Sequence, residues 1–183
     1  MAVVVTSVSD QSERPFAEQI AELLPRLRRF AYGLTRSRAD ADDLVQSALE
    51  RAVARIEQWE PGTRLDSWLF RIVQNLWIDE RRAQRRRGLE VGGEELLEMV
   101  GDDGRTTVER QLMLDDTQRA LQSLPDEQRA VVLLVSVEGL SYAQAADVLA
   151  VPVGTVMSRL ARGRKAIASA VLGAAHAGDA IDG

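Results

Sequence analysis

The stretch GLSYAQAADVLAVPVGTVMSRLARGRK, residues 139–165, predicts two helices joined by a tight turn. Ser141 can cap the first helix, with Gln144 three positions later as the second member of a capping box. The turn spans residues 150–153 and contains a proline, and a longer helix follows from residue 154 or 155 to about residue 172. This is the layout of a helix-turn-helix, whose second helix enters the major groove of duplex DNA. An ordinary helical hairpin would show the same periodicity, so the pattern alone leaves both interpretations open.

The longer helix has two faces when its residues are placed at 100° intervals. Val156, Leu160 and Ile167 form the predicted buried row. The polar and basic side chains point mostly outward, and these are Thr155, Ser158, Arg159, Arg162 and Lys165. Val156 and Leu160 are therefore expected in the core, although they lie in the helix that would face DNA.

A second informative stretch, RLDSWLFRIVQNLWIDERRAQRRRG, residues 64–88, places five arginines among the seven positions 81–87. A helix from about residue 65 has one broad apolar arc that includes Trp68, whereas Trp77 lies at the edge of this arc. We expect Trp68 to be a core residue, while Trp77 can pack, stack on a base, or do both. Five cations so close together repel one another unless an anion is near, which favours a binding role for this end of the helix.

Two more helices are predicted before this stretch, and one between the two informative stretches. Residues 16–34 have apolar side chains at intervals of three and four, but Pro25 is expected to kink or divide that helix at Leu24. A second helix is expected to begin near Asp40. It leaves four polar side chains more exposed, which are Asp42, Asp43, Gln46 and Glu50. In the second half of the chain, residues 126–138 are predicted to form a helix that ends at a glycine.

The net charge of −5 is unevenly distributed. Residues 14–88 carry 15 arginines and 11 acidic side chains, and residues 118–172 carry 6 basic and 4 acidic side chains, whereas residues 89–117 carry 2 arginines and 9 acidic side chains. Two basic blocks separated by an acidic segment indicate a two-part binder of a polyanion, because a patch acts through its local potential within about 8–10 Å. Solvated helix faces and a soluble linker account for the charge equally well.

We therefore predict an all-α fold of two small helical domains joined by a flexible acidic linker. The predicted division is a disordered N-terminus at 1–14, a first domain at 15–88, the linker at 89–105, a second domain at 106–173 and a disordered tail at 174–183.

Composition excludes several classes of protein. The chain has no cysteine, so disulfides, thiolate metal sites and thiol catalysis are absent. No apolar run approaches the roughly 20 residues of a membrane span, and the first ten residues lack the pattern of a signal peptide, so we expect no membrane insertion and a cytoplasmic location. The only histidine, His176, lies in a tail rich in glycine and alanine. We expect no metal, no cofactor and no catalytic residue.

Four stretches together resemble the bacterial RNA polymerase sigma factors of the sigma-70 family, specifically the compact extracytoplasmic function (ECF) group. They are ADADDLVQSALERA at 39–52, DSWLFRIVQNLWIDERR at 66–82, LPDEQRAVVLL at 124–134 and the stretch at 139–165 quoted first. Each is weak alone, but their order and spacing match the family over most of residues 16–172. The resemblance implies a region 2 helical bundle, a linker and a region 4 helix-turn-helix.

The resemblance also implies partners and contact residues. Region 4 would read the −35 element through Thr155, Ser158, Arg159, Arg162 and Lys165. Region 2 would bind the −10 element, with a loop at 59–64 around an extruded base. The −10 contacts carried over are Trp59, Arg64, Arg71, Asn75, Arg81, Arg82, Arg85, Arg86 and Arg87. Core RNA polymerase would be bound at the β′ coiled coil and the β flap, with Asp43, Gln46 and Glu50 on the β′ coiled coil, and an anti-sigma factor would control the chain.

Three residues depart from the family pattern. Ser47 stands where many relatives have glutamate, in the helix expected to contact core polymerase. Met157 stands where lysine or arginine is usual, which removes one phosphate neutralisation. Gly163 stands where alanine is usual, which costs roughly 1 kcal/mol of helix stability.

Three other classes fit the sequence less well. An enzyme would need a metal or nucleotide site, and the acidic pairs lack histidine neighbours and strand-flanked glycine motifs. A helix-turn-helix regulator that acts without polymerase would leave the N-terminal basic block unexplained. A sigma-like decoy that only captures an anti-sigma protein would have no need of Asn75 and the arginine run.

Overall fold

The computed structural model describes residues 15–60, 63–88 and 117–179, with side chains as far as Leu172. The N-terminal helix group contains α1 (Phe16–Thr35), α2 (Arg38–Ala54), the 3-10 turn η2 (Ile56–Gln58) and α3 (Leu65–Arg86). The C-terminal helix group contains α5 (Asp126–Val132), the π-helical turn η3 (Leu133–Val137), α6 (Tyr142–Leu149) and α7 (Val153–Asp179), and residues 117–123 are also helical. The all-α prediction is confirmed. The predicted N-terminus and linker lie outside the described residues.

One helix start in each group is fixed by a side-chain cap. The Ser37 hydroxyl accepts a hydrogen bond from the Asp40 N–H at 3.3 Å, so α2 begins at Arg38, slightly before the predicted start. The predicted capping box of α6 is confirmed, because the Ser141 hydroxyl accepts from the Gln144 N–H at 3.2 Å and the Gln144 side chain accepts from the Ser141 N–H at 2.8 Å. Ala150, with a φ of 52°, ends α6 and opens the turn.

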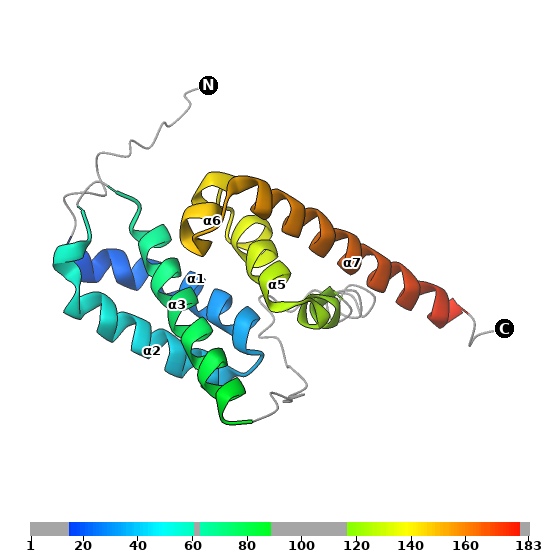
Figure 1. The fold of residues 1–183 in the computed structure, drawn as a ribbon, viewed down its shortest axis with the longest axis horizontal. Coiled ribbons are helices and arrows are strands. Elements are labelled where there is room, and N and C mark those ends of the chain that lie inside the picture. The colour runs from blue at the N-terminus through cyan, green and yellow to red at the C-terminus, as the bar shows by residue number, and fades with distance from the viewer. Residues whose placement is uncertain (1–14, 61–62, 89–116, 180–183) are drawn as a thin grey trace, which may run out of the picture.

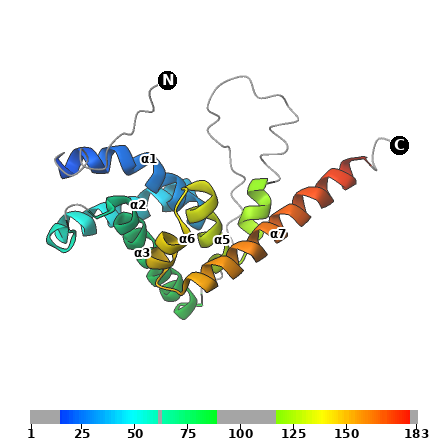
Figure 2. The same ribbon diagram turned by 90° about the horizontal axis from the view of Figure 1, so that it is seen from above.

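Two helices continue past points where the sequence suggests a break. The sequence leaves a kink or a division at Pro25 open, and α1 runs through Pro25 without a division. Pro25 and Ala21 are both exposed, and water can therefore satisfy the carbonyl that the proline leaves without a helical donor. α7 runs to Asp179 rather than ending near residue 172, and it projects beyond both helix groups (Figures 1 and 2).

The two helix groups share one continuous hydrophobic core, which the sequence does not predict. Phe30 and Phe70 meet edge to face at 5.2 Å inside the N-terminal group. The same cluster of buried side chains extends to Val131 and Leu134 of the C-terminal group. α6 packs on α3, and α5 and η3 pack on α1 (Figure 2). The two predicted units therefore fold against each other.

Gly163 reverses an expectation from helix propensity. A Cβ at this position would lie 2.7 Å from Cγ2 of Val132, so glycine allows α7 to approach α5 closely. Val132 is buried and β-branched, which leaves its side chain little freedom to move away. The residue that weakens α7 as an isolated helix thus permits its packing.

We therefore expect Gly163→Ala to lower the free energy of unfolding by about 1–2 kcal/mol, because overpacking outweighs the gain in helix propensity. Urea denaturation measures the change. Gly154→Ala is the matched control, since a Cβ there meets no atom within 4 Å, and it should be neutral or stabilising. Equal stability of Gly163→Ala and wild type would show that a methyl group fits between α7 and α5 without strain.

Candidate nucleic-acid interface

The arginine-rich end of α3 carries most of the predicted −10 contacts. Four of its five arginines are exposed, namely Arg82, Arg85, Arg86 and Arg87. Arg81 is half-buried, and its guanidinium lies 6.0 Å from the centroid of the Trp77 ring. The sequence leaves packing and base stacking open as roles for Trp77. Its side chain is only 5% exposed, so it packs in the core. Trp68, predicted as core, is instead half-buried at the edge of the core, 6.5 Å from the Phe16 ring.

Part of this arginine run contacts the C-terminal helix group. Nη2 of Arg81 lies 3.2 Å from Oδ2 of Asp126 at the start of α5, and Nη2 of Arg85 lies 3.7 Å from the same oxygen. Asp126 also pairs with Arg129, a buried residue three positions later. Burial and the nearby Arg36 lower the pKa of Arg129, and Asp126 opposes that shift. The Asp126 carboxylate therefore pairs with three guanidinium groups.

The middle of α3 faces the turn of the helix-turn-helix. Arg71 and Asn75 are exposed, and both line a hollow of about 510 Å³. The opposite wall of this hollow includes Asp147 of α6 and Pro152 of the turn. These two predicted −10 residues thus lie opposite the predicted −35 domain.

The predicted base pocket at 59–64 is described only in part, because residues 61 and 62 lie outside the described ranges. Trp59 is half-buried, with its ring 5.7 Å from that of Phe16. Arg64 is exposed, and its guanidinium binds Asp66 through two hydrogen bonds of 3.0 and 2.6 Å. Trp59 therefore belongs partly to the core.

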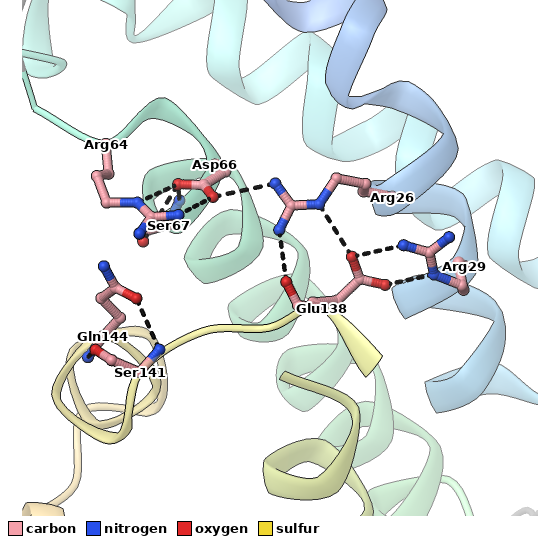
Figure 3. A network of polar contacts seen from close by, with 8 residues as sticks. All are labelled: Arg26, Arg29, Arg64, Asp66, Ser67, Glu138, Ser141 and Gln144. Atoms are coloured by element: carbon pink, nitrogen blue, oxygen red, sulfur yellow. Dashed lines mark hydrogen bonds and ion pairs between the residues drawn. The ribbon is translucent and has the colours of Figure 1, made fainter. Parts of the chain in front are cut away.

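A polar network joins the two helix groups where the chain leaves η3 (Figure 3). The Glu138 carboxylate, whose side chain is fully buried, accepts hydrogen bonds from Nε of Arg26 at 3.1 Å and from Nε and Nη2 of Arg29 at 2.7 and 3.0 Å. Arg26 also donates to the Glu138 backbone oxygen at 2.9 Å and to Asp66 at 3.1 Å. The side-chain hydrogen bond to Glu138 raises the pKa of Arg29.

The same network fixes the charge of Asp66. Burial alone would raise the pKa of this carboxyl group, but hydrogen bonds from Arg64, Arg26 and the Ser67 N–H outweigh burial and lower it. Asp66 thus remains an anion at the junction. Sequence reasoning missed the whole network, because its members are separated by as many as 112 positions along the chain.

The predicted −35 residues share one side of the first turns of α7. Ser158, Arg162 and Lys165 are exposed, and Thr155 is half-buried. The Arg162 Nε donates to the Ser158 backbone oxygen at 3.2 Å, so this guanidinium lies along the helix. Arg159 differs from the others, because its side chain is 19% exposed and bound to Glu127 of α5. Met157, one of the departures from the family pattern, is exposed beside them.

The residues predicted to contact core polymerase form an exposed face of α2. Asp43, Gln46 and Glu50 all point to solvent, and the Gln46 amide donates to Glu50 at 3.1 Å. Ser47 is exposed beside them. The buried side of the helix, with Leu44 and Ala48, packs into the core.

Metal sites and membrane spans are two other kinds of feature. Among the described side chains of residues 15–60, 63–88 and 117–172, no group of three or more His, Asp or Glu is placed to hold a metal ion. In the same part of the chain, no helix is long and apolar enough to cross a membrane.

Comparison with known proteins identifies this arrangement. A family described as sigma-70, region 4 matches residues 114–167, and one described as the sigma2 domain of PhyR matches residues 20–74. The chain is 36% identical over 152 residues to ECF RNA polymerase sigma factor EcfG of Rhodopseudomonas palustris, covering 83% of this chain and 82% of that protein. It is 36% identical over 168 residues to ECF RNA polymerase sigma factor SigE of Mycolicibacterium smegmatis, covering 88% and 64%.

Solved structures agree with these relatives. The sigma factor RpoE of Bartonella quintana, in complex with the anti-sigma factor NepR, superposes with a TM-score of 0.71 at 30% identity, covering 86% of this chain and 96% of that one. CnrH, in complex with the cytosolic domain of CnrY, gives a TM-score of 0.62 at 25% identity, covering 91% and 95%.

The helix-turn-helix of the C-terminal group, the helical bundle of the N-terminal group and these matches define an RNA polymerase sigma factor of the sigma-70 class. The chain belongs to the ECF sigma factor family, and sigma factors are transcription initiation factors.

Proposed function

We propose that the chain binds core RNA polymerase through α2, contacts the −10 element through α3 and reads the −35 element through the start of α7. The observation that carries this proposal is the placement of three residue sets on separate parts of the fold. The core-polymerase set lies on the exposed side of α2, and the two DNA sets lie at the arginine-rich side of α3 and the start of α7. One chain therefore carries a proposed surface for polymerase and a proposed surface for each of the two promoter elements.

The proposed polymerase contact is electrostatic and hydrogen-bonded. Asp43 and Glu50 present carboxylates to solvent, and Gln46 lies between them as a donor and acceptor. Charged groups at a rim of this kind set partner choice and association rate. The proposed binding site on polymerase is the β′ coiled coil, with region 4 on the β flap.

Glu50→Arg is expected to weaken binding of core polymerase at least about tenfold, because a repulsive charge would replace an attractive one at the interface. Competition with the wild-type chain for purified core enzyme measures this. Glu57→Arg is the matched control: it makes the same charge change at an exposed position of η2, outside the proposed contact. If Glu50→Arg competes as well as the control while keeping its helical content, the proposed polymerase face is wrong.

We further propose control by a protein anti-sigma factor. Support comes from the RpoE and CnrH structures, which are complexes with NepR and with the cytosolic domain of CnrY. A partner of this class should exclude core polymerase, so adding it to a reconstituted holoenzyme should stop transcription. In this proposal the chain acts in the cytoplasm, where core polymerase is found, and has no catalytic activity of its own.

A second candidate function is that of a decoy for an anti-sigma factor. The match of residues 20–74 to the sigma2 domain of PhyR favours it, since PhyR is an anti-anti-sigma factor in its complex with NepR. A decoy needs no exposed cations for DNA, whereas this chain keeps Arg82, Arg86 and Arg87 in solvent. Binding of core polymerase separates the two candidates, because only the sigma factor requires it.

A further inference from the structure

The adjacent carboxylates Asp126 and Glu127 contact arginines from both proposed DNA-binding sets. Asp126 pairs with Arg81 and Arg85 of the −10 set, at 3.2 and 3.7 Å. Glu127 pairs with Arg159 of the −35 set. Two neighbouring residues at the start of one short helix thus bind cations from two surfaces that would otherwise face DNA.

These pairs surround a cavity of about 310 Å³ between the helix groups. Its lining includes Arg82 and Gln74 in addition to the paired residues. Two buried polar atoms on this lining, Oε1 of Gln74 and Nε of Arg81, have no hydrogen-bond partner. The polar contacts across this cavity therefore do not satisfy every buried donor and acceptor on its lining.

Each pair occupies donors that a phosphate would otherwise take. Arginine binds carboxylate and phosphate through the same fork of N–H groups, so one guanidinium edge cannot serve both. Arg85 is mostly exposed and Glu127 is 70% exposed, which makes these pairs easy to exchange. Asp126 is held more firmly, because it also pairs with the buried Arg129.

We propose that Asp126 and Glu127 are intramolecular competitors of DNA, which occupy Arg81, Arg85 and Arg159 in the free chain and must be displaced before promoter phosphates bind. This inference rests on the proposed function of those arginines. It assigns to the two carboxylates a role in setting DNA affinity: they lower the affinity of the chain for DNA of any sequence, so that binding requires the additional contacts of the holoenzyme at a promoter.

The test uses the full chain and a fluorescein-labelled duplex of random sequence, with binding followed by fluorescence anisotropy at several salt concentrations. Asp126→Asn/Glu127→Gln should bind the duplex at least about fivefold more tightly than wild type at low salt, since partly exposed pairs of this kind are each worth at least a few-fold. The slope of log K against log salt should steepen by about one unit for each arginine that gains a phosphate. Glu127→Gln alone should give a smaller increase in DNA affinity, and it leaves Asp126, the partner of the buried Arg129, in place. Glu127→Asp should bind like wild type.

Glu57→Gln is the matched control for Glu127→Gln, because it removes the same charge at an exposed carboxylate of η2. An equal gain in DNA affinity by this control, or no gain by Glu127→Gln and by a folded double variant, would overturn the inference. Failure of the proposed function is a separate result. In that case neither wild type nor variant would support transcription with core polymerase, whatever happens to random duplex binding.

Discussion

Replacing Arg85, Arg86 and Arg87 together with alanine is expected to abolish transcription from the cognate promoter. All three side chains are exposed at the end of α3, so their loss should leave the fold intact. If each neutralises one phosphate, the slope of log K against log salt for holoenzyme binding should fall by about three units. Promoter binding at physiological salt should then drop by more than about a hundredfold. Reconstituted transcription and a salt titration of promoter binding measure the two effects.

The matched control is the replacement of the same three residues with lysine. Lysine keeps the positive charge as a point cation, so much of the phosphate binding should remain. Loss of activity in both variants would indicate that the guanidinium geometry matters more than charge. Full activity of the alanine variant would remove the proposed role of this cluster.

The second large effect is expected at Glu138. Glu138→Gln should lower the free energy of unfolding by about 2–4 kcal/mol, because it removes a buried charge that Arg26 and Arg29 both bind. Glutamine has nearly the same size, so the loss would come from charge and hydrogen bonding rather than from a cavity. Urea denaturation followed by tryptophan fluorescence measures the change.

Asp42→Asn provides the comparison for this prediction. Asp42 pairs with Arg28 at 3.4 Å, and both side chains are mostly exposed, so the substitution should cost less than about 1 kcal/mol. If Glu138→Gln costs no more than Asp42→Asn, the Glu138 network does not stabilise the contact between the two helix groups.

Local features of the fold could be predicted well from the sequence. The capping box at Ser141 and Gln144 depends on residues three positions apart, and its geometry is confirmed. The buried positions Val156 and Leu160 follow from helical periodicity and are also confirmed. In these cases the physical cause lies within one or two helical turns.

Contacts between distant residues could not be predicted in the same way. The pairing of Glu138 with Arg26 and of Asp126 with Arg81 depends on how the two helix groups pack, and no local pattern encodes that arrangement. Trp77 shows the same limit. It lies at the edge of the apolar arc of its own helix, but packing in the fold buries it.

Gly163 illustrates a related limit. Helix propensity marks it as a weak point, yet its absent side chain is what allows α7 to approach Val132. For the candidate site, the resemblance to sigma factors supplied the contact residues, whereas the carboxylates that bind some of them are visible only in three dimensions.

Run-off transcription with purified core polymerase over a library of genomic fragments tests the central claim most directly. The account predicts transcripts that appear only when the chain is added, that start downstream of a shared pair of −35 and −10 elements, and that the Glu50→Arg chain fails to produce. No chain-dependent transcripts, together with no association between the chain and core polymerase, would contradict it.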